Sequence, residues 1–181
     1  EFKSDLMDLY LIKNCRFFLG TRAGIYDIAT MFQVTSLIPN SIPNLLSQPQ
    51  KKEDIFIYKH VYDKLSNNFI SVRDLNDFFK SRNFNDKDID FIENTEEEIY
   101  ELVEEFFNRE NGCIEYSDLQ LKWISEIKNT IIREEINKTG LVKVSAIQKY
   151  RQLSKILGAS GIIGKKFIQE NYSTSSMGKR K

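Results

Sequence analysis

The chain has 181 residues, of which 41% are hydrophobic and 12% aromatic, so it is long enough to bury a core of its own. Its 26 basic and 26 acidic side chains cancel, which argues against a broad surface for nucleic acid or membrane. Cys15 and Cys113 have no CxxC spacing and make no disulfide framework, so we expect reduced thiols and a cytoplasmic protein. No apolar run reaches the roughly 20 residues that span a bilayer.

The first forty residues predict an alternation of helices and strands. Ser4–Lys13 reads as an amphipathic helix, and Cys15–Leu19 reads as a buried strand. Gly20–Gly24 predicts a sharp turn into a second helix. The apolar face of that helix comprises Ile25, Ile28, Ala29 and Phe32. A second strand is predicted over Val34–Ile38.

The glycine turn between a strand and a helix is typical of a phosphate-binding loop. Two glycines let the backbone turn tightly and let a ligand approach, and the free N–H groups of a helix start favour an anion. The spacing is neither GxGxxG nor GxxxxGK[ST], and a strand-turn-helix with two glycines is more often an ordinary α/β connection, so that interpretation of Gly20–Gly24 stays open.

The middle of the chain is less regular. Pro39, Pro43 and Pro49 predict a loop that lines a ligand edge, and Ile55–Tyr58 predicts a short strand. Asn67-Asn68 breaks the pattern, apolar residues recur at helical spacing from Val72 to Phe79, and Ile89–Ile92 predicts a last short strand.

The remainder of the chain is predicted to be helical. A helix over 95–108 starts at Thr95 and Glu98, which have the spacing of a capping box. Its glutamates are expected on the solvated face, and they are Glu93, Glu96, Glu97, Glu98, Glu101, Glu104 and Glu105. Three further helices are expected over 117–137, 145–157 and 162–170. The predicted core comprises Cys15, Phe17, Leu19, Ile28, Phe32, Leu102, Phe106, Trp123 and Ile127.

Several segments match the pattern of one known family. The first segment reads approximately S-x-x-M-D-x-x-L-x-x-C-x-F-F-x-G-T-x-S-G, then an apolar helix, a strand, and Asn followed by Pro. The matching residues are Ser4, Met7, Asp8, Leu11, Cys15, Phe17, Phe18, Gly20, Thr21, Gly24, Asn40 and Pro43. Ile92–Ile99 is similar to I-E-N-T-x-E-E-I. Leu119, Gln120 and Trp123 are similar to L-Q-x-x-x-W, and Ile163, Gly164, Phe167, Ile168 and Asn171 to I-G-x-x-F-L-x-x-N.

On the basis of these matching residues, the chain resembles a bacterial glycosyltransferase-like family, related in fold to GT-B enzymes of the O-fucosyltransferase and heptosyltransferase type. The resemblance implies an α/β fold with a small parallel sheet flanked by helices, as in a GT-B C-terminal lobe, and a helical C-terminal third. It implies a nucleotide-sugar-binding lobe over 1–115, a helical extension over 116–173, a disordered tail over 174–181 and a missing N-terminal lobe.

The resemblance also implies a function in which a sugar passes from a nucleotide sugar to a glycan or other acceptor, in surface polysaccharide or glycoconjugate synthesis. The donor diphosphate and nucleotide would bind Gly20, Thr21, Arg22, Ala23, Gly24 and Asn40. The catalytic residue is not indicated. No cofactor or metal is expected, because His60 is the only histidine and has no HxxxH or Cys partner.

Two departures from the family pattern bear on activity rather than fold. The family has Ser where this chain has Ala23, and its Gly-x-Pro-like turn after the helix is replaced by Phe32-Gln33-Val34-Thr35. The missing Ser and the missing N-terminal lobe favour the alternative, a non-catalytic α/β-plus-helical interaction module. A role as a base is one interpretation of His60, but a lone histidine beside Val61 and Tyr62 is more often structural.

Overall fold

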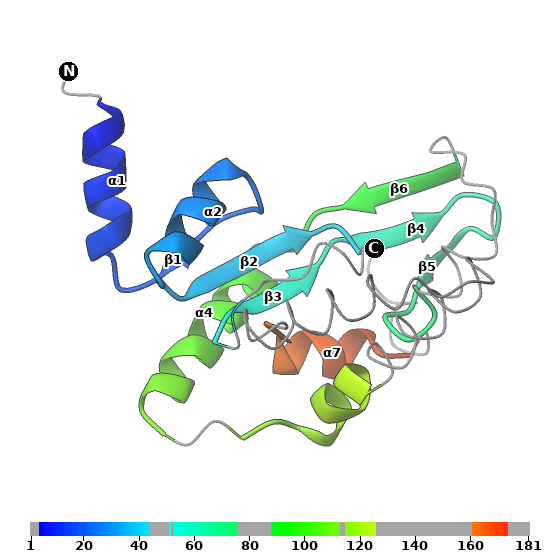
Figure 1. The fold of residues 1–181 in the computed structure, drawn as a ribbon. Helices are drawn as coiled ribbons and strands as arrows, with labels where there is room; N and C mark the ends of the chain where they lie inside the picture. Colours follow the sequence, from blue (N-terminus) through cyan, green and yellow to red (C-terminus); the bar gives the residue numbers. More distant parts are fainter. Residues whose placement is uncertain are drawn as a thin grey trace, which may run out of the picture.

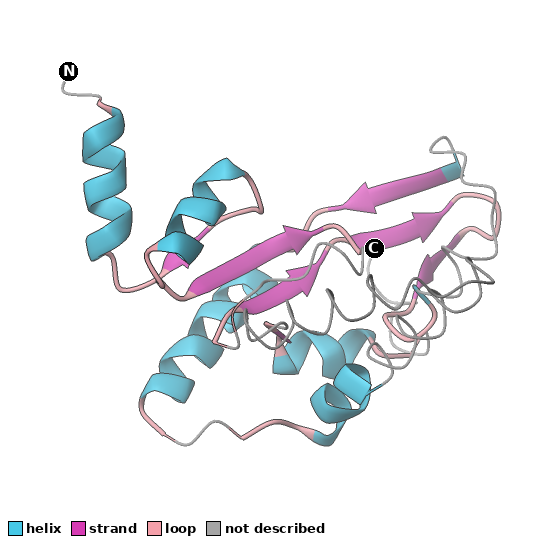
Figure 2. Ribbon diagram, viewed as in Figure 1, coloured by secondary structure: helices cyan, strands magenta, loops and turns pink. Residues whose placement is uncertain are grey.

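The protein is built around a parallel sheet of four strands. The structure, a computed structural model, describes residues 4–43, 51, 53–75, 88–112, 115–125 and 161–173. The strands β1 (Phe18–Leu19), β2 (Ser36–Ser41), β3 (Ile55–Tyr58) and β7 (Ile162–Ile163) lie side by side in that order, all parallel (Figure 1; Figure 2). The predicted α/β class with a small parallel sheet is therefore confirmed.

The chain enters the sheet through two helices. Helix α1 (Asp5–Asn14) precedes β1, and α2 (Gly24–Met31) connects β1 to β2. The strand expected over Cys15–Leu19 is shorter than predicted, because Cys15 ends α1 instead: its backbone N–H and its thiol both point to the carbonyl of Ile12. Cys15 belongs both to the helix end and to the apolar run, so the run alone did not reveal this boundary.

Two adjacent phenylalanines show that helices cover both faces of the sheet. Successive strand residues point to opposite faces. The ring of Phe17 packs on Phe106 of α4 (Glu96–Glu110), at 5.0 Å between centroids, whereas Phe18 packs with Ala29 and its neighbours between α1 and α2. All four residues of β3 are buried, as expected of a parallel strand covered on both sides. Figure 1 shows α2 and α4 on opposite sides of β2.

A second, antiparallel sheet continues from the first. After β3 the chain passes through Lys59 into β4 (His60–Asp63), which lies between β5 (Asn68–Ile70) and β6 (Ile89–Ile92). The strand predicted at Ile89–Ile92 is thus confirmed, but it pairs only with β4 among the described residues. The break predicted at Asn67 is a turn in which that residue has φ 55°.

The C-terminal part is not wholly helical. The capping box of α4 is present, and residues 118–125 are helical. The helix expected over 162–170 begins only at Lys165 (α7, Lys165–Asn171), because Ile162–Ile163 forms β7 and pairs with β3. Two isoleucines between Gly161 and Gly164 carry no periodicity of their own, so their strand depends on a partner far away in sequence.

The predicted core is partly right. Leu102, Phe106 and Trp123 are buried, as predicted. Leu19 and Phe32 are exposed, at 44% and 38%, because β1 is an edge strand and Phe32 follows the last turn of α2. Cys15, Phe17 and Ile28 are half-buried. In α2 the buried residues are Tyr26 and Ala29, whereas Ile25 and Phe32 are exposed. The buried face of the helix is therefore turned relative to the face that was predicted.

Some predictions lie outside the described residues. They are Ile127, Pro49, the segment 76–79, most of the helix predicted over 117–137, the helix over 145–157 and the tail over 174–181.

Candidate functional site

The predicted site residues gather at one edge of the parallel sheet. Because β1 and β2 are parallel, their carboxyl ends lie at the same edge, where ligands collect in open α/β sheets. Gly20–Ala23 follows β1, and Asn40 lies near the end of β2, the neighbouring strand. The structure therefore brings both predicted parts of the site to this carboxyl edge.

The loop after β1 is held by its backbone. The N–H of Gly20 donates to Leu37 O (3.2 Å), that of Ala23 to Thr21 O (2.9 Å) and that of Tyr26 to Ala23 O (2.8 Å). No side chain caps the start of α2. The N–H groups of Gly24 and Ile25 open the helix and have no acceptor within it. A phosphate would therefore meet Gly24 and Ile25 rather than Ala23, whose N–H already has an acceptor.

The two glycines of the loop differ in their surroundings. A Cβ on Gly20 would lie 2.8 Å from Cζ of Phe18, so a side chain at position 20 would force that ring to shift. A Cβ on Gly24 would meet no atom within 4 Å, and the backbone there is not left-handed. The fold itself therefore does not need glycine at position 24, which leaves open space over the start of α2. Beside it, the guanidinium of Arg22 lies over the ring of Tyr26, 5.7 Å from its centroid.

Asn40 lies in a bulge of β2. The loop predicted around Pro39 is wrong at that residue, because Pro39 is a buried strand residue. A proline is tolerated there because β1 ends opposite Leu37, so no β1 carbonyl awaits an N–H from position 39. Three steps on β2, from Ile38 to Ser41, face two on β3, from Phe56 to Tyr58. Asn40 lies within this bulge and has φ 55°, a left-handed conformation that asparagine adopts more readily than most residues.

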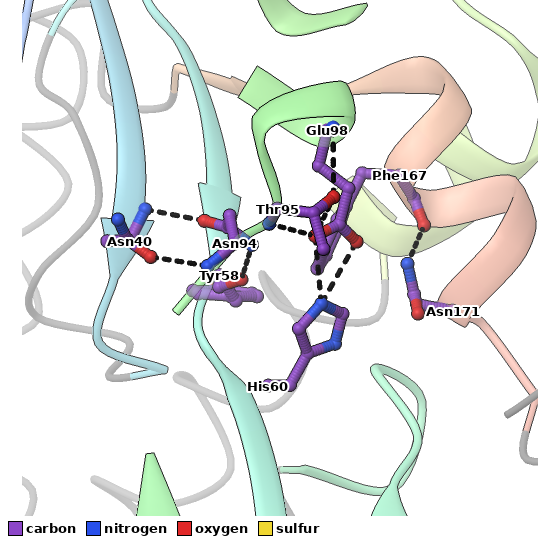
Figure 3. Close-up of polar contacts among 8 residues, drawn as sticks. All are labelled: Asn40, Tyr58, His60, Asn94, Thr95, Glu98, Phe167 and Asn171. Atoms are coloured by element: carbon purple, nitrogen blue, oxygen red, sulfur yellow. Dashed lines mark hydrogen bonds and ion pairs between the residues drawn. The ribbon is translucent and has the colours of Figure 1, made fainter. Parts of the chain in front are cut away.

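A reciprocal pair of hydrogen bonds joins Asn40 to Asn94, which follows β6. The N–H of Asn40 donates to Oδ1 of Asn94 (2.6 Å), and the N–H of Asn94 donates to Oδ1 of Asn40 (2.7 Å). The carboxamide N–H of Asn94 donates to the carbonyl of Tyr58 (2.8 Å). Figure 3 shows how these bonds tie the end of β2 to the end of β3 and to the segment before α4. We call the two reciprocal bonds the Asn40–Asn94 clasp.

The first turn of α4 carries a buried carboxylate that contacts the only histidine of the chain. Nε2 of His60 lies 2.9 Å from Oε1 and 3.1 Å from Oε2 of Glu98. Glu98 also accepts from the N–H of Thr95 (2.9 Å), which completes the capping box. His60 packs against the rings of Phe69 and Phe167, at 6.1 and 5.6 Å between centroids. This enclosure supports the structural interpretation of His60.

The prediction that Glu98 lies on a solvated face is wrong. Glu98 is only 5% exposed, because its carboxylate turns back to Thr95 and inward to His60. The capping-box spacing was a signal for this orientation, since a glutamate at the third helical position reaches back to the cap. Nothing local to the sequence indicated that His60, 38 residues earlier, would meet it.

The strongest electrostatic perturbation lies at the other edge of the sheet. Burial raises the pKa of the Asp54 carboxyl from 3.8 to about 6, although the N–H groups of Ser36 and Lys51 that donate to it act in the opposite direction. Asp54 precedes β3 and ties it to the first residue of β2 and to the hydroxyl of Tyr26. Asp54 thus lies at the amino edge, where its hydrogen bonds connect β2, β3 and α2.

Comparisons with protein-family models, with curated proteins and with solved structures find no match for this chain. Within the part of the chain that the structure describes, no helix is long and apolar enough to cross a membrane. No three His, Cys, Asp or Glu side chains are grouped to hold a metal ion among those same residues.

Proposed function

We propose that this chain is the donor-binding lobe of a glycosyltransferase that transfers a sugar from a nucleotide sugar to a glycan or other acceptor, in surface polysaccharide or glycoconjugate synthesis. One observation carries the proposal. The β1–loop–α2–β2 unit presents Gly20–Gly24 and Asn40 at the carboxyl edge of a parallel sheet. That edge is where nucleotides bind in folds of this class.

In the proposed complex the diphosphate lies over the start of α2. The N–H groups of Gly24 and Ile25, with the positive end of the helix dipole, bond the phosphate oxygens. The hydroxyl of Thr21 adds a neutral donor. Arg22 supplies positive charge as the leaving diphosphate develops negative charge. The open space over Gly24 supports this placement, because it leaves room for a phosphate.

Calorimetry on the full chain with GDP, UDP, ADP and CDP tests the proposal. One of the four nucleotides is expected to bind. Gly24→Val should remove binding because its side chain fills the open space, and Arg22→Ala should weaken binding by one charge-assisted bond, about 1.5–3 kcal/mol. Ala23→Ser, which restores the family's hydroxyl, should leave binding intact or tighten it. Absence of heat from all four nucleotides at millimolar concentration would refute the proposal.

The second candidate is a non-catalytic interaction module. Its specific support is the apolar surface of α1, where Leu6, Met7, Tyr10 and Leu11 are all exposed. An interaction module needs no nucleotide, so the same calorimetry separates the two candidates.

A further inference from the structure

The Asn40–Asn94 clasp fixes which atoms of Asn40 remain for a ligand. A backbone N–H can only donate, so the atom of each carboxamide that faces the other residue's N–H must be oxygen. The orientation of both side chains follows without ambiguity. Oδ1 of Asn40 accepts from the N–H of Asn94, so the carboxamide N–H groups of Asn40 point away from that N–H.

Among the residues that the structure describes, none accepts a hydrogen bond from Nδ2 of Asn40, which is half-buried. The bulge places the residue at the carboxyl edge, on the strand next to the Gly20–Gly24 loop. Asn40 therefore presents carboxamide N–H donors at the edge where the proposed ligand lies.

Asn94 and the residue after it make further hydrogen bonds besides the clasp. Its Nδ2 donates to Tyr58, and the next residue, Thr95, caps α4 through Glu98, which meets His60. Asn94 and Glu98 are both largely buried. These hydrogen bonds connect the clasp to the place where β3, β4 and α4 meet, and Figure 3 shows them as dashed lines.

We propose that Asn94 is a positioning residue that fixes the orientation of Asn40, so that the carboxamide N–H groups of Asn40 act as donors in the ligand site. The inference rests on the proposed function and deepens it. The ligand places an oxygen that accepts a hydrogen bond, from its diphosphate or from a sugar hydroxyl, against Nδ2 of Asn40.

The first test uses two variants of Asn40 and the nucleoside diphosphate that binds most tightly. Asn40→Asp keeps an oxygen for the N–H of Asn94 and tolerates φ 55°, but loses the donor. Asn40→Gly also suits this backbone and loses the donor without adding charge. Each should raise Kd about 10- to 100-fold.

The same variants distinguish the two sources of oxygen. If a phosphate oxygen is the acceptor, Asn40→Gly should also weaken the binding of free pyrophosphate. If a sugar hydroxyl is the acceptor, its effect should be confined to the nucleotide. An unchanged nucleotide Kd in Asn40→Gly overturns the inference, even if Asn40→Asp weakens binding, because charge repulsion alone then explains the aspartate.

The second test asks whether Asn94 acts through Asn40. Asn94→Ala should weaken nucleotide binding about 10-fold in the wild-type background and have little further effect in Asn40→Gly, measured where circular dichroism shows every variant folded. Asn94→Asp, which keeps an acceptor for the N–H of Asn40, replaces Asn94→Ala if the latter does not fold. Equal effects in both backgrounds, or no effect in either, contradict the positioning role.

Failure of the inference and failure of the proposed function are distinguishable. If wild-type protein binds nucleotide and the Asn40 variants bind equally well, the inference fails and the proposed function stands. If wild-type protein binds none of the four nucleotides, both the proposed function and the inference fail.

Discussion

His60 and Glu98 form a buried pair in which Nε2 of the imidazole lies within 3.1 Å of both carboxylate oxygens. The two side chains are 7% and 4% exposed. The pair joins the first residue of β4 to the first turn of α4, and so fixes the junction on which the Asn40–Asn94 clasp depends.

Removing Glu98 should therefore destabilise the protein strongly. Glu98→Ala removes the buried carboxylate that contacts Nε2 of His60 and accepts from the N–H of Thr95, so the free energy of unfolding should fall by about 3–5 kcal/mol. Glu98→Gln is the matched control. Glutamine completes a capping box and offers His60 an acceptor, and its cost should be clearly smaller. Urea denaturation of both variants measures the difference, and equal losses would show that the carboxylate does not hold the junction.

Asp54 should make stability depend on pH. Its pKa is 3.8 when unfolded and about 6 when folded, because burial disfavours the charged carboxylate. The folded state then binds the proton more tightly. This contribution to stability is full below pH 3.8 and is lost as pH rises through about 6, by about 3 kcal/mol over the whole interval.

Urea denaturation between pH 4.5 and pH 7.5 measures this contribution. Asp54→Asn should flatten the fall in stability across that range, because an amide does not titrate. Asp90→Asn, a change at an exposed carboxyl, should retain the slope. If the Asp54 variant loses stability with pH as steeply as wild type, another buried group must be responsible.

Local patterns predicted the elements whose partners are near in sequence. The capping box at Thr95 and Glu98, the buried strand at Ile55–Tyr58 and the glycine turn into α2 are each encoded within a few residues. They could be placed from the sequence because their defining hydrogen bonds or burial follow from local spacing.

Long-range partners decided the features that the sequence did not reveal. Ile162–Ile163 is a strand only because β3 accepts it, and Asn94 is a site candidate only because Asn40 lies opposite, 54 residues away. Asn94 was visible in the family pattern but without a role. Asparagine beside a helix cap and at a strand end is a signal for bonds between side chain and backbone, but it does not name the partner.

The revised core gives a matched pair of truncations. Phe106→Ala removes a ring that is 5% exposed and packs on Phe17 and Phe107, so it should cost about 3–5 kcal/mol. Phe32→Ala removes a ring that is 38% exposed at the end of α2 and should cost much less, about 1 kcal/mol or below. Thermal or urea unfolding of the two variants compares them directly, and similar costs would contradict the burial seen for these rings.

The two glycines of the loop should respond in opposite ways to an added methyl group. Gly20→Ala places Cβ 2.8 Å from the ring of Phe18, which must shift within its packed surroundings, so stability should fall by about 1–3 kcal/mol. Gly24→Ala meets no atom within 4 Å and replaces glycine at the first position of α2, so stability should be unchanged or slightly raised. The comparison matters for the ligand test, because it establishes that position 24 tolerates a side chain in the empty protein. A loss of stability in Gly24→Ala as large as that in Gly20→Ala would mean that failed binding by Gly24→Val reflects the fold rather than a blocked phosphate.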